Sequence, residues 1–232
     1  MVYLGRVVGI GKNDDGLDFG VYAVSGRSEM SKQRRAEIAG NSVSIGPSGE
    51  LTEEQKKMSN LIFYDAIRVP EMPNEQEHLP LVLSNGVHTN DIEKYLRSYS
   101  RLNSVESALA DNGVEPDKYR TPRIAGAAQV PFGAVLGIVT EDGIGVSNFT
   151  DSFLSKKPFV STYCGDENDP KEIVIPRISL PTGYLDVNGR TAQELADSMY
   201  GWMDQDLVVC SAAALWLPDK KQWEIAVRNL HE

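Results

Sequence analysis

Seven polar side chains at the ends of apolar runs are the residues of this chain best suited to chemistry on an anionic substrate. They comprise arginines, which stay charged and donate a planar fork of hydrogen bonds, and groups that exchange protons or hydrogen bonds. The set is Arg27, Arg34, Tyr64, Asn85, Thr89, Glu115 and Arg123. Taken singly, each of these residue types is common in surface or structural positions. Their chemistry therefore depends on the elements that bring them together.

The stretch from Val82 to Asp91 contains the clearest junction of this kind. An apolar run leads into Asn85-Gly86 and then into a helical pattern. Asn and Gly both tolerate positive φ, which predicts a tight turn. The first N–H groups of a helix lack internal partners, so such a junction can bind an anion. A plain strand-to-helix connection explains the same pattern, because Asn-Gly turns are common.

Other catalytic chemistries find little support in the sequence. The three histidines, His78, His88 and His231, are scattered and show no metal-binding spacing, so we expect no metal. Ser84 lies outside any Gly-x-Ser-x-Gly motif, which argues against a Ser-His-Asp hydrolase. Cys164 and Cys210 form neither a disulfide framework nor a zinc motif, and we expect buried thiols.

Composition narrows the class of protein further. The chain has 232 residues, is 41% hydrophobic and carries a net charge of −10 with a pI near 4.9. This charge argues against a general nucleic-acid or membrane-surface binder, although a few arginines in one pocket can still bind a small anion. No signal-peptide run and no stretch of about 20 apolar residues is present, which favours a cytoplasmic protein.

Strand-like segments dominate both ends of the chain. β-branched runs bounded by turn residues predict an opening hairpin, a middle group of strands, a second group after Thr121 and a closing pair. The predicted strands are 3–10, 19–24, 38–45, 61–69, 124–130, 135–139, 144–149, 159–164, 172–175, 207–217 and 223–227. Residues 70–80 and 155–170 are expected to be peripheral loops, and no linker divides the chain.

Three helices are predicted between and after the strand groups. Asn90 with Glu93, and Thr191 with Glu194, have the spacing of capping boxes before apolar residues that repeat with helical period. Ser104 is expected to cap a further short helix. Grouped helices and antiparallel strands predict a single α+β domain over residues 1–232.

Several motifs, in this order, resemble the archaeal-type IMP cyclohydrolases. Tyr-Leu-Gly-Arg at 3–6, Tyr-Ala-Val-Ser-Gly-Arg-Ser at 22–28, Tyr-Asp-Ala-Ile-Arg at 64–68, Ser-Asn-Gly-Val-His-Thr at 84–89 and Thr-Pro-Arg-Ile-Ala at 121–125 are similar to motifs of that family. The departures are Gly26 and Val87, where the family has serine, Asp65, where it has asparagine, and the longer segment 29–34, where it has Phe-Pro-Asn-Arg. The resemblance covers about residues 3–149, and the C-terminal third, about 156–232, has no matching motif.

The resemblance implies a four-layer αββα sandwich like that of the N-terminal-nucleophile hydrolases, but without self-cleavage. It also implies closure of the second ring of inosine monophosphate (IMP) without a cofactor. A carboxamide nitrogen attacks a formyl carbon, and the carbinolamine formed loses water. The implied partners are a purine nucleotide and further copies of the chain, with a tetramer among the expected assemblies, but neither nucleic acid nor membrane.

Roles for the seven residues follow from the resemblance and from what the reaction requires, which is positioning, proton removal and stabilisation of the formyl oxygen. Arg27, Tyr64 and Glu115 are the catalytic candidates, with Glu115 as base and Tyr64 as proton donor or relay. Both Arg27 and Arg34 are candidates for the formyl oxygen or the phosphate. The substrate-binding candidates are Arg34, Asn85, Gly86, Thr89 and Arg123. A non-catalytic nucleotide-binding protein and an amide hydrolase of the same architecture are the alternatives.

Overall fold

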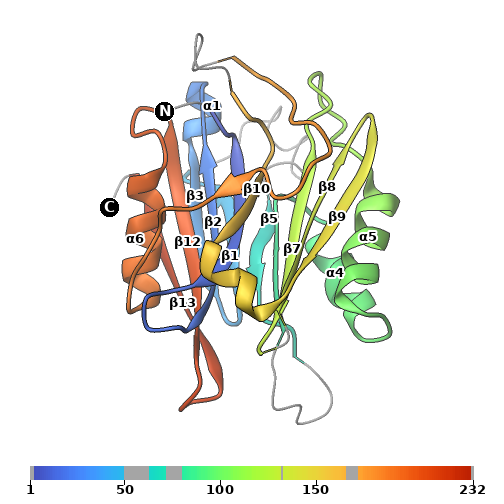
Figure 1. Cartoon of the computed structure of the whole chain (residues 1–232). Coiled ribbons are helices and arrows are strands. Elements are labelled where there is room, and N and C mark those ends of the chain that lie inside the picture. The colour runs from blue at the N-terminus through green and yellow to red at the C-terminus, as the bar shows by residue number, and fades with distance from the viewer. Residues whose placement is uncertain (1–2, 50–62, 72–79, 132, 166–171, 231–232) are drawn as a thin grey trace.

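Two antiparallel β-sheets packed face to face, with helices on both outer sides, make up the protein (Figure 1). The computed structural model describes residues 3–49, 63–71, 80–131, 133–165 and 172–230. Helix α6 (Ala192–Trp202) covers one sheet, while α4 (Thr89–Leu96) and α5 (Arg101–Asn112) cover the other. The predicted α+β sandwich of layers αββα is confirmed.

The first sheet combines strands from both ends of the chain. Its order is β11-β10-β1-β2-β12-β13. The strands are β1 Arg6–Lys12, β2 Asp18–Ser25, β10 Pro158–Ser161, β11 Gly183–Tyr184, β12 Val208–Leu217 and β13 Gln222–Asn229. The predicted opening hairpin and closing pair are both present, and they are neighbours, because Tyr22 of β2 lies opposite Ala212 of β12.

The second sheet follows the order of the chain, β3-β4-β5-β6-β7-β8-β9. The strands are β3 Arg34–Ala39, β4 Ser42–Pro47, β5 Tyr64–Arg68, β6 Pro80–Ser84, β7 Arg123–Gln129, β8 Ala134–Thr140 and β9 Gly143–Phe149. The prediction of one strand over 38–45 was wrong. Gly40 adopts φ +59° and turns the chain, so β3 and β4 form a hairpin instead.

Two strand and loop predictions in the C-terminal half need correction. The strand predicted over 159–164 is the shorter β10, and residues 172–175 form no strand. The loop predicted over 155–170 begins inside a 3₁₀ helix, η1 (Asp151–Lys156), and includes β10. Most of the loop predicted over 70–80, including His78, lies outside the described residues, as do His231 and the start of the strand predicted over 61–69.

The starts of the helices show where local sequence decides the structure. Thr191 accepts a hydrogen bond from the Glu194 N–H at 3.1 Å, so this predicted cap of α6 is confirmed. Helix α5, in contrast, begins four residues before the position expected from Ser104, because Ser100 caps it by accepting from the Asn103 N–H. A further short helix, α1 (Glu29–Lys32), lies in the connection between β2 and β3.

The capping box predicted for α4 was wrong. His88 occupies the N-cap position and makes no side-chain cap. Asn90 and Glu93 instead both accept hydrogen bonds from Nη1 of Arg68, at 2.7 and 2.8 Å. Arg68 of β5 therefore binds the two side chains whose spacing suggested a capping box.

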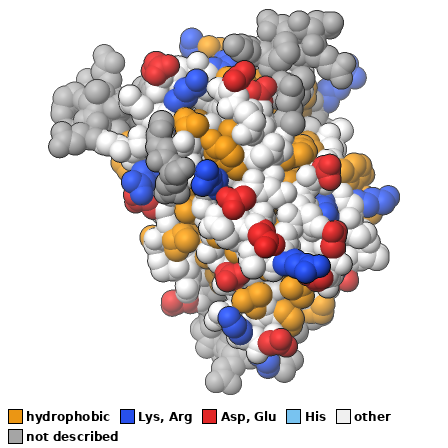
Figure 2. Space-filling model, turned by 90° about the vertical axis from the view of Figure 1, so that its left-hand side faces the viewer, with side chains coloured by type: hydrophobic (Ala, Val, Ile, Leu, Met, Phe, Trp, Pro, Cys, Tyr) orange, Lys and Arg blue, Asp and Glu red, His pale blue; other side chains and the backbone are white. Residues whose placement is uncertain are grey.

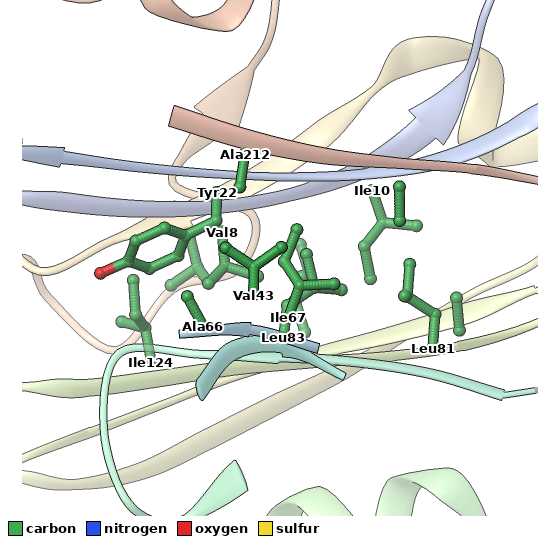
Figure 3. Packing of buried hydrophobic residues seen from close by; sticks show 14 of the residues in the cluster. Val8, Ile10, Tyr22, Val43, Ala66, Ile67, Leu81, Leu83, Ile124 and Ala212 are labelled. Carbon is green, nitrogen blue, oxygen red and sulfur yellow. The ribbon is translucent and has the colours of Figure 1, made fainter. Parts of the chain in front are cut away.

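The main hydrophobic core fills the space between the sheets (Figure 3). Val8 and Ile10 from β1 and Ile67 and Leu83 from the facing sheet are fully buried there. Tyr22 projects into the same space from β2, with its hydroxyl at the edge of the cluster (Figure 3). The hydroxyl of Tyr22 thus places a polar group at one edge of this apolar core.

On the side covered by α6, acidic and basic side chains are interspersed among hydrophobic ones (Figure 2). This face therefore carries charges of both signs. None of the helices in the described parts of the chain has the length and apolar character needed to cross a bilayer.

Candidate active site

A cavity of about 440 Å³ opens at one end of the sandwich, where β1 begins and β2 ends. Its walls also come from the β2–β3 connection, the loop between α5 and β7, and the residues after β10. The volume of the cavity lies within the size range of small-molecule sites. Its lining residues include four cationic side chains and three tyrosines. They are Tyr3, Gly5, Arg6, Ser25, Arg27, Ser28, Ser31, Arg34, Asp117, Lys118, Tyr119, Thr121, Thr162, Tyr163 and Ile173.

Residues 3–6 form one wall of this cavity, called the larger cavity because a second, smaller one lies elsewhere. Gly5 adopts φ +69° and lies so close to Thr162 and Tyr163 that a Cβ would overlap both. The ring of Tyr3 stacks on Tyr163 with centroids 5.4 Å apart. Glycine is therefore needed here both for its backbone conformation and for space, and it places Arg6 at the cavity.

Arg27 and Arg34, which the resemblance suggested for the formyl oxygen or the phosphate, both line the larger cavity. The Arg27 guanidinium lies over the Tyr3 ring, 4.7 Å from its centroid, on an exposed side chain. Arg34 is half-buried at the start of β3. Burial raises the pKa of Cys210 to about 12, and the charge of Arg34 opposes this shift. Among the described lining residues Asp117 is the only acidic one, and it accepts two hydrogen bonds from Thr121, at 2.9 and 2.6 Å.

Glu115 lies next to this cavity but does not line it. Its carboxylate is 2% exposed and accepts a hydrogen bond from Nη1 of Arg6 at 2.8 Å. Burial lowers the pKa of Arg6, but Glu115, with smaller contributions from Tyr64 and Tyr22, outweighs it and holds this pKa well above its usual range. The structure thus joins the predicted base to an arginine that sequence analysis did not single out.

Arg123 is a second buried guanidinium beside this pair. Nε and Nη1 have no hydrogen-bond partner among the described residues. Burial and the neighbouring Arg6 lower the pKa of Arg123, while Glu115 and Asp117 oppose the shift. Two cations therefore share the charge of the buried Glu115, and the half-buried Asp117 adds a second negative charge that acts on Arg123.

Asn85 and Gly86 play parts different from those predicted. Neither adopts positive φ, so the turn chemistry inferred from Asn-Gly was wrong. Asn85 is fully buried, donates to the Pro122 carbonyl and accepts from the Ile124 N–H, which ties the end of β6 to β7. Gly86 leaves space for the guanidinium of Arg123.

Tyr64 and Thr89 line a separate cavity of about 270 Å³ together with Asp65. The Tyr64 hydroxyl is 2.6 Å from the buried hydroxyl of Tyr22. The Thr89 hydroxyl contacts the Asp65 carbonyl and Ser84. Arg6, which lines the larger cavity, lies within electrostatic range of Tyr64 and Tyr22, and both help to raise its pKa.

His88 is fully buried and stays neutral. Nε2 lies 3.0 Å from the Ile124 carbonyl and must carry the hydrogen, since a carbonyl only accepts. Burial is the main cause that lowers its pKa to about 3, and the charges of Arg123 and Arg6 act in the same direction. His88 thus serves as a structural donor between α4 and β7.

Six of the seven predicted residues fall into three pairs, while Asn85 lies apart from them and ties the end of β6 to β7. Arg27 and Arg34 line the larger cavity, Glu115 and Arg123 are buried beside Arg6, and Tyr64 and Thr89 line the smaller cavity. Sequence reasoning missed Arg6, although it ends the segment 3–6. It also missed Tyr163 and Lys118, which carry no local signal of their place in the fold. Within the described ranges, His, Cys, Asp and Glu form no group that could hold a metal ion.

The fold and the larger cavity define an α+β sandwich protein with an arginine-rich cavity at one end. The family model of IMP cyclohydrolase-like proteins matches residues 3–220, and the chain belongs to this family. The match extends through most of the C-terminal third, where the motifs gave no resemblance.

Relatives named IMP cyclohydrolase cover nearly the whole chain. The protein of Methanothrix thermoacetophila is 32% identical over 98% of this chain and 99% of its own. Those of Methanocella arvoryzae and Methanosphaera stadtmanae are 31% and 30% identical, each over 98% of this chain and over 98% and 100% of their own lengths. The similarity is therefore not limited to the motif region.

Proposed function

We propose that this protein is an IMP cyclohydrolase, which closes the purine ring of a 5-formamidoimidazole-4-carboxamide ribonucleotide with loss of water. Family membership supports this activity, as do the relatives that carry the name. One structural observation carries the proposal further. Residues from three of the separate motifs, Arg6, Arg27 and Thr121, meet in a single cavity.

The charge of this cavity suits a nucleotide. The chain has a net charge of −10, yet Arg6, Arg27, Arg34 and Lys118 line one cavity, and the described part of its wall holds a single carboxylate that is already hydrogen-bonded. A ribonucleotide phosphate is an anion with several acceptor oxygens, which arginines bind well. The stacked rings of Tyr3 and Tyr163 add an aromatic wall suited to a base.

The remaining roles are part of the same proposal. Arg34 and Arg123 bind the substrate, and Tyr64 serves acid–base chemistry or supports it from the smaller cavity. Asn85, Gly86 and Thr89 act indirectly, because they fix the β6–α4 junction beside Arg123. We further propose a cytoplasmic homo-oligomer with a fold of the N-terminal-nucleophile-hydrolase type. Light scattering after size-exclusion chromatography tests the assembly.

The test of the activity is the rise in ultraviolet absorbance as IMP forms from the formylated precursor. We expect the purified protein to accelerate this reaction far above the uncatalysed rate without an added cofactor. A protein that binds IMP but gives no acceleration would be a nucleotide-binding protein, and the proposal would be wrong.

A further inference from the structure

The guanidinium of Arg6 stands between the larger cavity and Glu115. Arg6 lines the cavity, whereas Glu115 is absent from its lining and only 2% exposed. The carboxylate is bound to Nη1 of Arg6 at 2.8 Å. A substrate in this cavity therefore meets the arginine first.

Both the main chain and the side chain of Arg6 are fixed. Its N–H donates to the Thr162 hydroxyl at 3.0 Å, and its carbonyl accepts from the Thr162 N–H at 2.9 Å. On its other side it pairs with Val24 of β2. Hydrogen-bond donors held in place before reaction stabilise developing charge without reorganisation.

The electrostatics around Arg6 favour a negative oxygen. Arg123 adds a second buried cation beside Arg6, and its Nε and Nη1 have no hydrogen-bond partner among the described residues. Arg6 stays protonated, because Glu115 outweighs the effect of burial on its pKa.

We propose that Arg6 is a catalytic residue that binds the formyl oxygen, and that Glu115 is the positioning residue which holds Arg6. The inference rests on the proposed cyclohydrolase function. As the carboxamide nitrogen forms its bond to the formyl carbon, the π electrons of the C=O bond move to the oxygen facing Arg6. One proton of the attacking nitrogen goes to this oxygen to give the carbinolamine. The C–O bond then breaks as the formamide nitrogen forms a C=N double bond and loses its proton, and the hydroxyl leaves with that proton as water.

The test compares Arg6→Lys with Glu115→Gln in the complete protein. Lysine at this position keeps the positive charge and can still pair with Glu115, but it lacks the planar fork of donors. We therefore expect the turnover number to fall about 10²- to 10³-fold. IMP binding should change only a few-fold. Glutamine keeps an acceptor oxygen for Nη1, so Glu115→Gln should lower turnover less than about tenfold and leave the acid limb of the pH–rate profile in place.

A double variant guards against loss of folding. Arg6→Met combined with Glu115→Gln leaves no unpaired charge from this ion pair, and we expect it to lose as much turnover as Arg6→Lys. The inference is overturned if Arg6→Lys or the folded double variant keeps turnover within tenfold of the wild type. It is equally overturned if Glu115→Gln alone costs 10²-fold or more and removes the acid limb, as a general base requires. An inactive wild type would instead refute the proposed function.

Discussion

The guanidinium of Arg123 occupies the space that a side chain on residue 86 would fill. A Cβ built on Gly86 overlaps Nη1 of Arg123, the far end of a flexible side chain. Because Gly86 does not adopt positive φ, space is what requires glycine there. This contact links the β6–α4 junction to the buried charges around Glu115.

Gly86→Ala is therefore expected to displace Arg123 while the protein still folds. If Arg123 binds substrate, the Michaelis constant should rise several-fold, and steady-state kinetics will measure it. Gly201→Ala is the matched control, because a Cβ on this residue of α6 meets open space. It should leave kinetics unchanged and can raise stability by about 0.5–1 kcal/mol. Wild-type kinetics in Gly86→Ala would contradict a substrate-binding role for Arg123.

Arg27→Ala should weaken binding more than it slows turnover. Arg27 is exposed and lies over Tyr3, so it is placed to hold an anionic group of the substrate and not to reach the buried pair. We expect the Michaelis constant to rise about 10- to 100-fold, as for a hydrogen bond to a charged group. Arg190→Ala is the control, since this exposed arginine lies beside Asp15 in the distant β1–β2 turn. A turnover loss of 10²-fold or more would support the catalytic role first predicted.

The hydroxyl pair of Tyr22 and Tyr64 should show strong coupling in a double-mutant cycle. Each single change to Phe leaves a buried hydroxyl without its present partner, at a cost of about 1–3 kcal/mol in the free energy of unfolding. Removing both hydroxyls should cost less than the sum of the two single changes. Denaturant unfolding measures all three variants, and additive costs would mean that the hydroxyls do not depend on each other.

The same Tyr64→Phe protein tests acid–base chemistry by Tyr64. A proton-transfer role predicts a loss of about 10² to 10⁴ in turnover, whereas a structural hydroxyl predicts a change within a few-fold. Tyr22→Phe is the matched control, because it breaks the same hydrogen bond and leaves the Tyr64 hydroxyl in place.

His88 should make the protein less stable as pH falls. Its pKa in the folded state is about 3, below the ordinary value of 6.5, so only the unfolded chain takes up its proton between these values. This one group should lower the free energy of unfolding by about 2 kcal/mol between about pH 7 and pH 5. His88→Gln keeps a donor for the Ile124 carbonyl and does not titrate. Denaturant unfolding of both proteins at each pH gives the difference, and equal pH dependence would contradict the buried neutral state.

IMP should raise the melting temperature of the wild-type protein. A ligand that binds only the folded state adds about 2.7 kcal/mol at 100 times its dissociation constant. Arg27→Ala should need a higher IMP concentration for the same shift, and Arg190→Ala should not. If neither IMP nor its aminoimidazole precursor shifts the wild-type melting temperature, nucleotide binding is excluded together with the proposed enzyme.

Local sequence was sufficient to predict those elements whose capping and turn residues make no competing bonds to distant parts of the chain. Thr191 caps α6 as its spacing predicted, and the Asp14-Asp15-Gly16 turn joins β1 and β2. The Asn90 and Glu93 pair shows the limit of such reasoning, because Arg68 of β5 takes both side chains. The spacing of a capping box shows which local hydrogen bonds are possible. It does not show whether a residue distant in the sequence will bind the same side chains instead.

The candidate site was only partly readable for the same reason. Arg27 and Arg34 were identified from residue type and motif, and both line the larger cavity. The bond between Arg6 and Glu115 joins positions 109 apart, which no local pattern encodes. Tyr64 and Thr89 were grouped with these residues by motif order, yet they line a different cavity.

By itself, the sequence determined the α+β class, the opening and closing hairpins and the family, because alternation, turn residues and motifs act over a few residues. Only the tertiary structure decided that β2 pairs with β12 and that β1 pairs with β10. Pairing between distant strands depends on burial of apolar faces across the whole chain, and many registers satisfy the same local pattern. The ion pair at the cavity depends on the same tertiary structure, because Arg6 belongs to β1 of one sheet and Glu115 to the connection between α5 and β7 of the other.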